Sequence, residues 1–437
     1  MSMVYDIAYL LLLGLAAPWL VFQALRTGKY RQGWRQKFLG SVVERSSDRP
    51  CIWFHAVSVG EVNLLVQMVE QWKVRHPDWD VVVTSTTKTG YELARQRFPD
   101  SIVDYCPLDF SWATGRAFRR LRPNLLVLAE LELWPNMIGT AQRLGVPVSV
   151  INGRLSESSF RGYQKIRRLV SHWLGQVAWI GTQSETYSDR FRKLGAAADG
   201  VSCTGSLKFD RAEFDRSNSR TSQLKSLVGL TEESQVWVVG STQDPEEAMA
   251  IRVYQDLIQE WPNLKLVIVP RHAERFQEVI DKVQREPLSS IQRSHLESSI
   301  EGNWQVLVVD TIGELGAWWG TADVAYVGGS MGSRGGQNMI EPSAYGAAVC
   351  FGPNTRNFRD VVQLLLSHDA AKVVETERAM YEFLTQCLRN PEQATAMGVR
   401  AQDLVRHQQG ATERTLQGLE SLMPSGAKGE VGARAAA

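Results

Sequence analysis

Glu61 stands where an expected strand gives way to an expected helix, and its carboxylate could act as a general base. Residues 51–57 are mostly apolar, and apolar residues recur at helical spacing after residue 61. Glu61 therefore falls in a first helical turn, where the positive end of the macrodipole favours the ionised carboxylate. The carboxyl end of a parallel strand is also where open α/β sheets bind ligands. The alternative is that Glu61 only caps the helix and that His55 only braces the turn.

A second acidic pair, Glu130 and Glu132, follows the apolar run 125–129. Carboxylates at the end of a buried strand are costly to bury unless they are paired. Pro135 then suits the first position of a helix. We interpret the pair as functional, and the alternative is a polar strand end followed by a helix cap.

Three cations follow two other strand candidates in the first half of the chain. Arg154 and Arg161 lie beyond the run 146–151, and Lys208 lies beyond the run 201–204. The forked guanidinium groups could bind an anion, and the lysine could reach a phosphate or a sugar carboxylate. Each has an ordinary alternative, since the arginines could pair with neighbouring acids and a lone lysine is usually solvated.

A glycine-rich segment, residues 328–338, carries the strongest signal in the second half. Four of its first eight residues are glycine, and it follows the strand candidate 324–328. Backbone N–H groups of such a loop can approach an anionic ligand closely. Asn338 is expected to cap the following helix, and Glu341 is placed to accept hydrogen bonds from ribose hydroxyls. The alternative is a flexible loop, although such loops do not usually join a buried strand to a capped helix.

Three further segments of the second half could hold a nucleotide. Residues 240–242 can present backbone and hydroxyl donors to an anion at a helix N-terminus. Arg271, at the end of the run 265–270, could meet a phosphate or stack on a base. Residues 310–315 form a glycine-containing turn where a base or ribose could sit. The segment that begins at residue 240 is not a Walker loop, because it has no G-K-[ST].

Strand candidates alternate with helical stretches in both halves, which predicts parallel, doubly wound α/β sheets. The candidates are residues 51–57, 80–85, 125–129, 146–151, 178–181 and 201–204, then 236–240, 265–270, 305–310, 324–328, 347–351 and 372–374. The polar stretch 210–235 is expected to link the halves and to contain a short helix. Residues 289–303 are expected to form a surface loop. Two Rossmann-like domains in one chain indicate the glycosyltransferase-B type of fold.

The N-terminus is expected to anchor the protein to a membrane. Between residues 3 and 25 the only charge is Asp6, and about 20 apolar residues suffice to span a bilayer. Since Pro18 would bend such a helix, an anchor lying in the interface is the alternative to a spanning one.

Basic residues follow the apolar run at once. They are Arg26, Lys29, Arg31, Arg35 and Lys37. The positive-inside rule then predicts that the rest of the chain lies in the cytoplasm. A cleaved signal peptide fits poorly, because the basic cluster follows the apolar run and does not precede it.

Composition and charge bound the remaining possibilities. A formal net charge of +1 over 437 residues gives no indication of nucleic-acid binding. Five scattered cysteines, with no C-x-x-C pair, predict free thiols and neither a zinc site nor a disulfide framework. The expected domains are a membrane anchor (1–25), an N-terminal Rossmann-like domain (26–215), a C-terminal Rossmann-like domain (216–423) and a disordered tail (424–437).

Eight short blocks, in this order, resemble those of the Kdo transferases of lipopolysaccharide assembly, where Kdo is 3-deoxy-D-manno-octulosonic acid. The blocks are S-V-G-E, E-x-E-L-W-P-N, N-x-R-L-S, G-S-L-K-F-D, P-R-H-x-E-R-F, D-T-x-G-E-L, G-G-S-x-x-x-R-G-G-x-N and G-P-x-T-x-N-F. They are spread over residues 55–360, so with the N-terminal anchor the resemblance covers nearly the whole chain.

The resemblance implies an inverting glycosyltransferase that needs neither metal nor cofactor and moves Kdo from CMP-Kdo to a hydroxyl of a lipid A precursor in the membrane. By match of motif, Glu61 takes the position of the general base, and Glu130 and Lys208 take positions that support the transition state. The CMP-contacting positions are Pro270, Arg271, Ile312, Gly313, Glu314, Asn338, Met339, Ile340 and Glu341.

The chain departs from the usual blocks at three positions. Gln337 and Gln243 each stand in place of a histidine, and Gly153 stands in place of an alanine. The two glutamines remove a group that can titrate near a phosphate. Two other functions stay open at this point: a related sugar-nucleotide enzyme, such as a UDP-N-acetylglucosamine epimerase, and a non-catalytic membrane protein that binds a nucleotide sugar.

Overall fold

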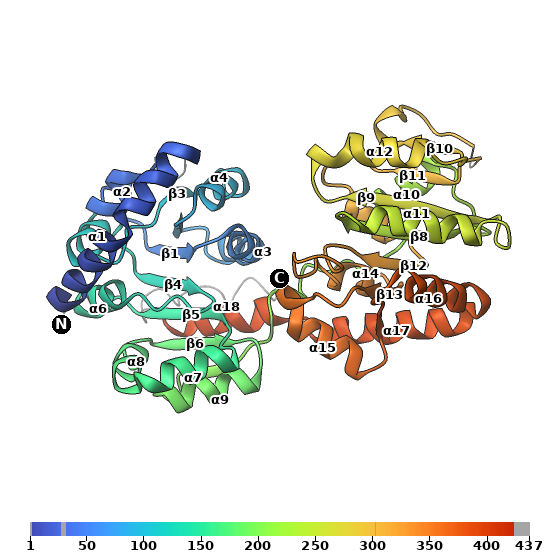
Figure 1. The fold of residues 1–437 in the computed structure, drawn as a ribbon. Helices are drawn as coiled ribbons and strands as arrows, with labels where there is room; N and C mark the ends of the chain where they lie inside the picture. Colours follow the sequence, from blue (N-terminus) through green and yellow to red (C-terminus); the bar gives the residue numbers. More distant parts are fainter. Residues whose placement is uncertain (1, 28–31, 302, 424–437) are drawn as a thin grey trace. The chain divides into compact units, whose positions relative to one another are not determined.

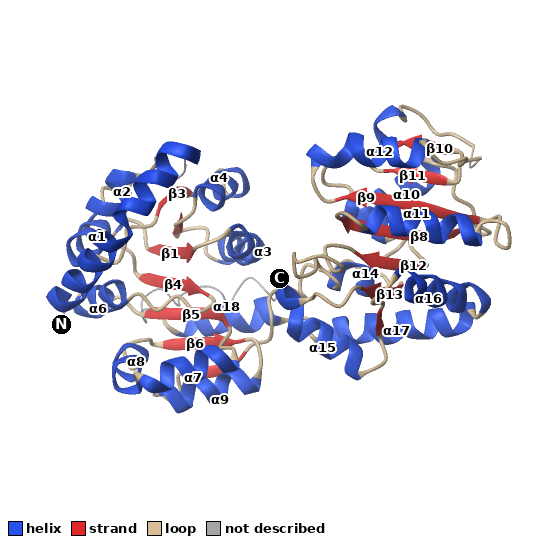
Figure 2. Cartoon of the chain, in the orientation of Figure 1, coloured by secondary structure: helices blue, strands red, loops and turns tan. Residues whose placement is uncertain are grey.

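The computed structural model describes residues 2–27, 32–301 and 303–423, which fold into two compact units (Figure 1). The first unit contains residues up to Asp210 and from Gln409 onward, and the second is Arg211–Gln408. Within the described residues, each unit is built around a seven-stranded parallel sheet with helices on both faces (Figure 2). The expected α/β class with two Rossmann-like domains and an N-terminal apolar helix is confirmed.

The strands of the first sheet lie in the order β3-β2-β1-β4-β5-β6-β7. They are β1 (Cys51–Ala56), β2 (Asp80–Ser85), β3 (Ile102–Tyr105), β4 (Leu125–Ala129), β5 (Val148–Gly153), β6 (Trp179–Thr182) and β7 (Val201–Cys203). Successive side chains of a strand point to opposite faces. Trp53 and Leu126 therefore enter the core on one face, while Phe54 and Leu125 enter the core on the other. Burial on both faces is the reason that these strands read as continuous apolar runs.

The helices of the first unit begin at recognisable signals. They are α1 (Ser2–Thr27), α2 (Trp34–Leu39), α3 (Val59–Arg75), α4 (Lys88–Arg97), α5 (Ser111–Leu121), α6 (Pro135–Arg143), α7 (Glu157–Lys165), α8 (Arg167–Leu174), α9 (Glu185–Leu194) and α18 (Ala411–Ser421). Ser58 caps α3 and Thr87 caps α4 with their side-chain oxygens. Pro135 is the first residue of α6, as the sequence predicts.

The second sheet has the order β10-β11-β9-β8-β12-β13-β14. Its strands are β8 (Gln235–Thr242), β9 (Leu264–Pro270), β10 (Ser290–Gln292), β11 (Val306–Val308), β12 (Val324–Val327), β13 (Ala348–Phe351) and β14 (Ala371–Val373). The helices of this unit are α10 (Ser219–Leu227), α11 (Glu246–Leu257), α12 (Phe276–Gln284), α13 (Leu315–Trp319), α14 (Ile340–Ala344), α15 (Arg359–Ser367), α16 (Glu377–Arg389) and α17 (Pro391–His407), with short 3-10 turns η1 (Ala273–Arg275), η2 (Arg293–His295) and η3 (Arg356–Phe358). The short helix expected within the polar stretch 210–235 is α10.

Two strands escape the sequence pattern. β3 and β10 each lie at one edge of a sheet, and β10 falls inside the segment 289–303 that the sequence predicts to be a loop. The prediction was wrong there because every residue of β10 is only partly buried, so the strand carries no apolar run. Ile102 and Val103 of β3 are likewise only partly buried.

The chain leaves the first unit after Asp210 and returns to it at Gln409. Helix α18 then packs on the first sheet, where Leu416 and Leu419 share a core cluster with Val62 of α3. The Asp210 carboxylate accepts hydrogen bonds from the N–H groups of Gly410 (2.8 Å) and Ala411 (3.2 Å), and also from that of Thr412. The expected boundary lay five residues later, and residues 409–423 were expected in the second domain. Residues 424–437, the expected tail, lie outside the described residues.

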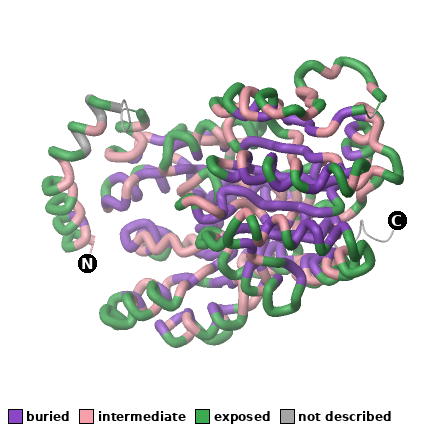
Figure 3. Tube along the Cα trace, turned by 45° about the vertical axis from the view of Figure 1, so that its right-hand side comes forward, coloured by how far each residue is buried: buried purple, intermediate pink, exposed green. Residues whose placement is uncertain are grey.

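Helix α1 has its polar side turned toward the protein and its apolar side turned away from it. Asp6 is 7% exposed and packs toward α5 and α6, and Tyr5 and Tyr9 on the same side are partly buried. The exposed side chains are Met3, Val4, Ile7, Leu10, Leu11, Leu12, Leu15, Trp19 and Phe22. Figure 3 shows α1 beside the N-terminus as a helix with almost no fully buried residue. Among the described helices α1 alone is long and apolar enough to cross a membrane, while Lys29 and Arg31 lie outside the described residues.

The cysteines are free, as the sequence predicts. Cys51, Cys106, Cys350 and Cys387 are buried, and Cys203 is partly buried. Burial raises the pKa of the Cys387 thiol to about 12, so this side chain behaves as a small apolar group.

Candidate active site

Glu61 is held at the carboxyl edge of the first sheet by the turn that joins β1 to α3. One carboxylate oxygen accepts a hydrogen bond from Val57 N–H (2.8 Å), and the other accepts one from the Ser58 hydroxyl (2.8 Å). The capping alternative is therefore real, since Ser58 and Glu61 form a capping-box arrangement. It does not exclude a base, because each carboxylate oxygen has a second lone pair. Burial raises the pKa of Glu61, and the charge of Glu130 adds to that effect.

Glu130 and Glu132 join Glu61 at this edge. Glu130 follows β4 with a left-handed backbone (φ 59°), and its N–H donates to the carbonyl of Ile151 on the neighbouring strand (2.9 Å). Burial, with the nearby charges of Glu61 and Glu130, raises the pKa of Glu132 to about 7. The carboxylates therefore stand close enough to oppose one another's ionisation. A site that keeps one acid poised near neutral pH is typical of proton-transfer chemistry.

His55 braces this edge and does not take part in it as a cation. The ring is fully buried on β1, and its Nδ1 lies 3.1 Å from both the carbonyl and the hydroxyl oxygen of Thr84. Burial lowers the pKa of His55 to about 4, so the ring is neutral at neutral pH. The His55 and Trp134 rings pack in a T-shaped arrangement, with centroids 5.9 Å apart. The contact ties the block that contains Glu61 to the block that contains Glu130.

Lys208 is held by its neighbours in the segment that follows β7. Leu207 and Phe209 on either side of it are buried, and the N–H of Leu207 donates to the side-chain oxygen of Asn152 (3.1 Å). Asn152 is itself left-handed (φ 54°) and lies in β5. The ends of β5 and β7 are therefore coupled, and the partly buried Lys208 projects from a fixed backbone.

The two arginines beyond β5 differ. Arg161 is exposed and pairs with Glu157 one turn earlier on α7 (3.0 Å), which is the ordinary alternative that the sequence left open. Glu157 also binds Arg190 (2.7 Å). Arg154 is only partly buried and remains a candidate for binding an anion.

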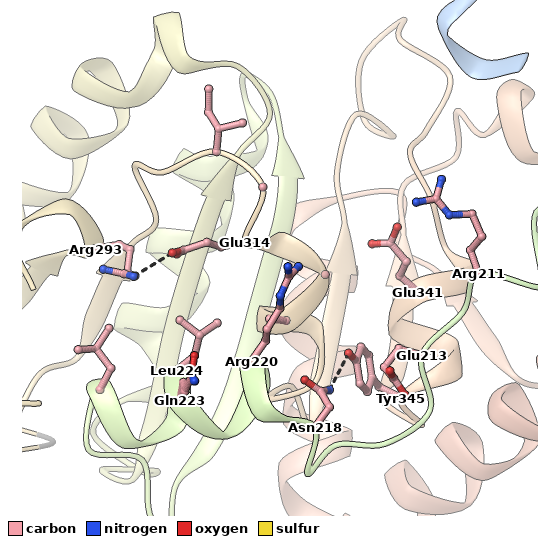
Figure 4. A pocket seen from close by; sticks show the side chains of 15 residues that line it. Arg211, Glu213, Asn218, Arg220, Gln223, Leu224, Arg293, Glu314, Glu341 and Tyr345 are labelled. Carbon is pink, nitrogen blue, oxygen red and sulfur yellow. Dashed lines mark hydrogen bonds and ion pairs between the residues drawn. The ribbon is translucent and has the colours of Figure 1, made fainter. Parts of the chain in front are cut away.

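The second unit has a pocket of about 770 Å³, drawn in Figure 4. Four of the predicted CMP-contacting residues line it: Ile312, Gly313, Glu314 and Glu341. Ile312 is 83% exposed, unusual for an isoleucine, and Gly313 has a left-handed backbone (φ 89°). Glu314 accepts hydrogen bonds from Arg293 (2.8 Å) and from the Thr311 hydroxyl (2.8 Å), which fixes the turn.

Glu341 lies among groups that match the predicted ribose site. The amide of Asn338 donates to its carboxylate (2.9 Å), and the Asn338 oxygen accepts from the N–H of Ile340, the first residue of α14. The expected cap differs by one residue, because Met339 occupies the N-cap position and makes no side-chain cap, while Asn338 reaches α14 from the residue before it. Burial raises the pKa of Glu341, and the charges of Arg211 and Arg271 oppose that shift. Arg271 is exposed after the end of β9 at Pro270. Met339 and Ile340 are buried and serve to pack α14.

Sequence reasoning missed much of the pocket wall. Arg211, Asn218 and Arg220 line the pocket, although the sequence pattern predicted only a link between domains there. Arg293 and Tyr345 line it too, and Asn218 donates to the Tyr345 hydroxyl (3.1 Å) (Figure 4). The density of arginine in residues 211–220 was the available signal, since a solvated link needs no such bias.

The glycine-rich loop does not present its first amides to a ligand. The N–H groups of Gly329 (2.7 Å), Ser330 (2.9 Å) and Met331 (3.0 Å) all donate to the carboxylate of Glu246, which is fully buried. Gln243 N–H (2.9 Å) and the Tyr326 hydroxyl (2.9 Å) donate to the same group. The expectation of an external anion at these amides was wrong, because the chain supplies its own anion from the start of α11. Gln243, the residue that follows β8, is therefore also bound to Glu246.

In the described part of the chain no group of three or more His, Cys, Asp or Glu side chains is arranged to hold a metal ion.

Comparison with known proteins identifies the family. A sequence model described as 3-deoxy-D-manno-octulosonic-acid transferase (kdotransferase) matches residues 32–211. The 3-deoxy-D-manno-octulosonic acid transferase of Haemophilus influenzae is 31% identical over 396 residues, covering 90% of this chain and 92% of the relative. The enzyme of the same name from Bordetella pertussis is 33% identical over 384 residues, covering 84% and 86%. The chain belongs to the Kdo transferase family.

Solved structures agree on the fold of this Kdo transferase. The UDP-GlcNAc 2-epimerase from Neisseria meningitidis superposes with a TM-score of 0.57, covering 85% of this chain and 100% of the epimerase, at 13% identity. A likeness at that identity concerns the fold alone. The epimerase alternative rested on the shared fold, whereas membership in the Kdo transferase family makes this chain a glycosyltransferase.

Proposed function

We propose that this Kdo transferase moves Kdo from CMP-Kdo to a hydroxyl of a lipid A precursor in lipopolysaccharide synthesis, with inversion at the anomeric carbon. The observation that carries the proposal is the gathering of Glu61, Glu130 and Glu132 at the carboxyl edge of the first sheet, where burial raises the pKa of Glu61 and of Glu132. Inversion needs a single base and no covalent intermediate.

Glu61 is the base in this mechanism. Its carboxylate takes the proton of the acceptor hydroxyl as that oxygen forms a bond to the anomeric carbon of Kdo. The bond from that carbon to the phosphate oxygen of CMP breaks on the opposite face, and CMP leaves with the bonding electrons. The two hydrogen bonds from Val57 N–H and Ser58 fix the direction of the carboxylate, and a raised pKa makes it a stronger base.

Lys208 and Arg154 are suited to the anionic parts of the reaction. Kdo carries a carboxylate, and an ammonium or guanidinium held by rigid neighbours can bind it or the developing charge. Glu130, with its left-handed backbone at the end of β4, supports the oxocarbenium-like positive charge that develops on the sugar.

The pocket of the second unit suits CMP. Arg211, Arg220 and Arg271 supply positive charge for the phosphate that leaves, so no metal ion is required for charge neutralisation. Glu341, fixed by Asn338, can accept hydrogen bonds from the ribose hydroxyls. The exposed side chain of Ile312 offers an apolar contact to the face of the base.

Helix α1 is suited to hold the enzyme on the cytoplasmic face of the inner membrane, where its acceptor resides. A spanning helix would be surrounded by lipid, but the inward side of α1 carries Asp6 in contact with the folded unit. An anchor lying in the interface keeps that side on the protein and buries the apolar side in lipid. Trp34 and Trp112, both about half exposed on neighbouring helices (52% and 44%), are residues favoured at headgroup depth.

The direct test is incubation with CMP-Kdo and a tetra-acylated lipid A precursor, followed by mass analysis of the lipid. We expect the acceptor to gain the mass of one or more Kdo residues, with release of CMP. The proposal would be overturned if CMP were released while the mass of the lipid stayed unchanged, or if no CMP-Kdo were consumed.

A further inference from the structure

Asp6 raises a question that membrane anchoring does not answer. It is the only charge between residues 3 and 25, and a charge in a membrane-seeking helix is unfavourable unless it has a specific partner. An anchor that served only as a tether would be better without it. The partners of Asp6 on the folded unit show what the residue does.

Asp6 caps helix α5 from outside that helix. Its carboxylate accepts hydrogen bonds from the N–H (2.8 Å) and the hydroxyl (2.5 Å) of Ser111, the first residue of α5. The residue at the N-cap position of α5, Phe110, has no side-chain group that can cap. The negative charge that the N-terminus of α5 favours is therefore supplied by α1.

Helix α6 is capped in the same way by Asp109. The N-cap residue of α6 is Trp134, which makes no side-chain cap. The carboxylate of Asp109 accepts instead from the N–H groups of Asn136 (3.0 Å) and Met137 (2.8 Å). Tyr9 of α1 donates its hydroxyl to the same carboxylate (3.0 Å).

Asn136 joins the two caps. Its side-chain amide donates to the Asp6 carboxylate (3.1 Å) and to the Asp109 carbonyl (2.6 Å), and it is 2% exposed. A buried network whose members are mutually bonded is rigid, because each unmet partner would be costly. Asp6 and Tyr9 of α1 therefore hold the N-terminus of α6 in place.

The start of α6 is also the end of the loop that carries Glu130 and Glu132. Four residues, Leu131 to Trp134, separate Glu130 from Pro135. Displacement of the α6 N-terminus would shift this loop and the Trp134 ring that contacts His55. Angstrom-scale misplacement of catalytic groups lowers turnover strongly.

We propose that α1 is a positioning element of the transferase as well as its anchor: through Asp6 and Tyr9 it sets the α6 N-terminus and hence the acidic loop Glu130–Trp134. The catalytic part of this inference rests on the proposed function, whereas the mechanical part does not. Asp6 and Tyr9 are positioning residues, since neither is among the groups that meet substrate in the mechanism.

The mechanical part is tested in the full-length protein in detergent by hydrogen–deuterium exchange of backbone amides. Asp6→Ala should speed exchange at Asn136 and Met137 about tenfold, and Tyr9→Phe by a smaller factor, since each removes a bond to a charged group. Exchange at Leu126 and Val127 of β4 should not change, which shows that the unit remains folded. Asp199→Ala, which removes an exposed aspartate of the same unit, should match the wild type throughout. Unchanged exchange at Asn136 and Met137 in Asp6→Ala overturns the inference.

The catalytic part is tested with the same variants and with acceptor dispersed in the same detergent, so that anchoring to a bilayer plays no part. Asp6→Ala should lower kcat about tenfold and leave KM for CMP-Kdo unchanged, with Tyr9→Phe between it and the wild type. An unchanged kcat in Asp6→Ala, despite faster exchange, would overturn the coupling to catalysis. A wild-type protein that forms no Kdo product would instead count against the proposed function and leave the exchange result standing.

Discussion

The two units have the same kind of sheet but treat their acidic residues in opposite ways. At the carboxyl edge of the first sheet, Glu61 accepts hydrogen bonds from a backbone amide and a hydroxyl, and Glu132 lies near the charges of Glu61 and Glu130. Burial raises the pKa values of Glu61 and Glu132. In the second unit, Glu246 receives hydrogen bonds from backbone amides and Tyr326, Glu247 pairs with Arg275, and Glu314 pairs with Arg293. One fold thus provides acids of raised pKa at the sheet edge of the first unit, whereas Glu246, Glu247 and Glu314 of the second unit are bound by amide, hydroxyl or arginine donors.

The difference teaches how a shared architecture is divided between two tasks. A carboxylate takes a proton more readily when its surroundings raise its pKa. A nucleotide site must instead offer positive charge that nearby carboxylates do not cancel. The second unit meets that requirement at Glu246, Glu247 and Glu314 by giving each of them partners within the unit. Arg211 and Arg220 then remain at the pocket wall.

The largest effect is expected from Glu61→Gln, which removes the proposed base of the first unit. The amide keeps the shape of the side chain but cannot take a proton, so transfer should fall by ~10²–10⁴-fold. Binding of CMP, measured by calorimetry, should not change, because the pocket of the second unit is intact. Near-normal turnover in this variant would remove Glu61 as the base.

Glu246→Gln should cause the next largest effect, on stability. Glu246 is fully buried and accepts from the amides of Gly329, Ser330 and Met331, so the NH₂ of glutamine would face donors. We expect the free energy of unfolding, measured by denaturant titration, to fall by about 3 kcal/mol. Glu274→Gln, at an exposed acid of the same unit, should change it by less than about 0.5 kcal/mol. Equal effects of the two changes would contradict an internal anion in the glycine-rich loop.

Arg293→Ala should have a smaller effect, confined to the donor site. It removes the basic partner of Glu314 and thereby loosens the turn 311–314, while the partly exposed Glu314 carboxylate stays at the pocket. CMP should bind about tenfold more weakly, as expected for the loss of one bond between charged groups. Arg285→Ala, at an exposed arginine after α12, is the matched control and should bind CMP normally. A normal CMP affinity in Arg293→Ala would show that the turn is not part of the site.

The smallest effect concerns the pH dependence of stability and tests the poised acid. The folded pKa of Glu132, about 7, lies above its unfolded value, so its contribution to stability is fully present below the unfolded pKa and is lost as pH rises through about 7. Between pH 5 and pH 8 the wild type should therefore lose about 1 kcal/mol more than Glu132→Gln. Asp109, whose pKa burial also raises to about 7, titrates in both proteins and cancels in the comparison. Parallel curves for the two proteins would contradict the poised acid.

Much of the fold was predictable because its signals are local. Continuous apolar runs marked the central strands, and Pro135 and Asn338 marked the starts of α6 and α14. β3 and β10 were not predicted, since Ile102 and Val103 of β3 and all three residues of β10 are only partly buried and form no continuous apolar run. The return of α18 to the first unit was also hidden, because the hydrogen bonds of Asp210 join residues 200 and more positions apart.

The candidate site was predictable as a set of strand ends but not as a set of contacts. Glu61 and Glu130 could be named from their positions, whereas the opposition between their charges depends on the pairing of β1 with β4. The role of Glu246 could not be foreseen, because an acid at a helix start looks the same whether it faces solvent or a loop 83 residues away. The sequence shows Asp6 as the only charge in the apolar N-terminal segment, and its partners on α5 and α6 are visible only in the fold.

The central claim, that an acid in the first unit acts as a base in an inverting transfer, is tested most directly by the configuration of the new bond. CMP-Kdo labelled with ¹³C at the anomeric carbon can be supplied with the lipid acceptor and the product examined by NMR. The account predicts the anomeric configuration opposite to that of the donor, from direct displacement with one base. Retained configuration would contradict it, because a single displacement from the face opposite the leaving CMP always inverts the anomeric carbon.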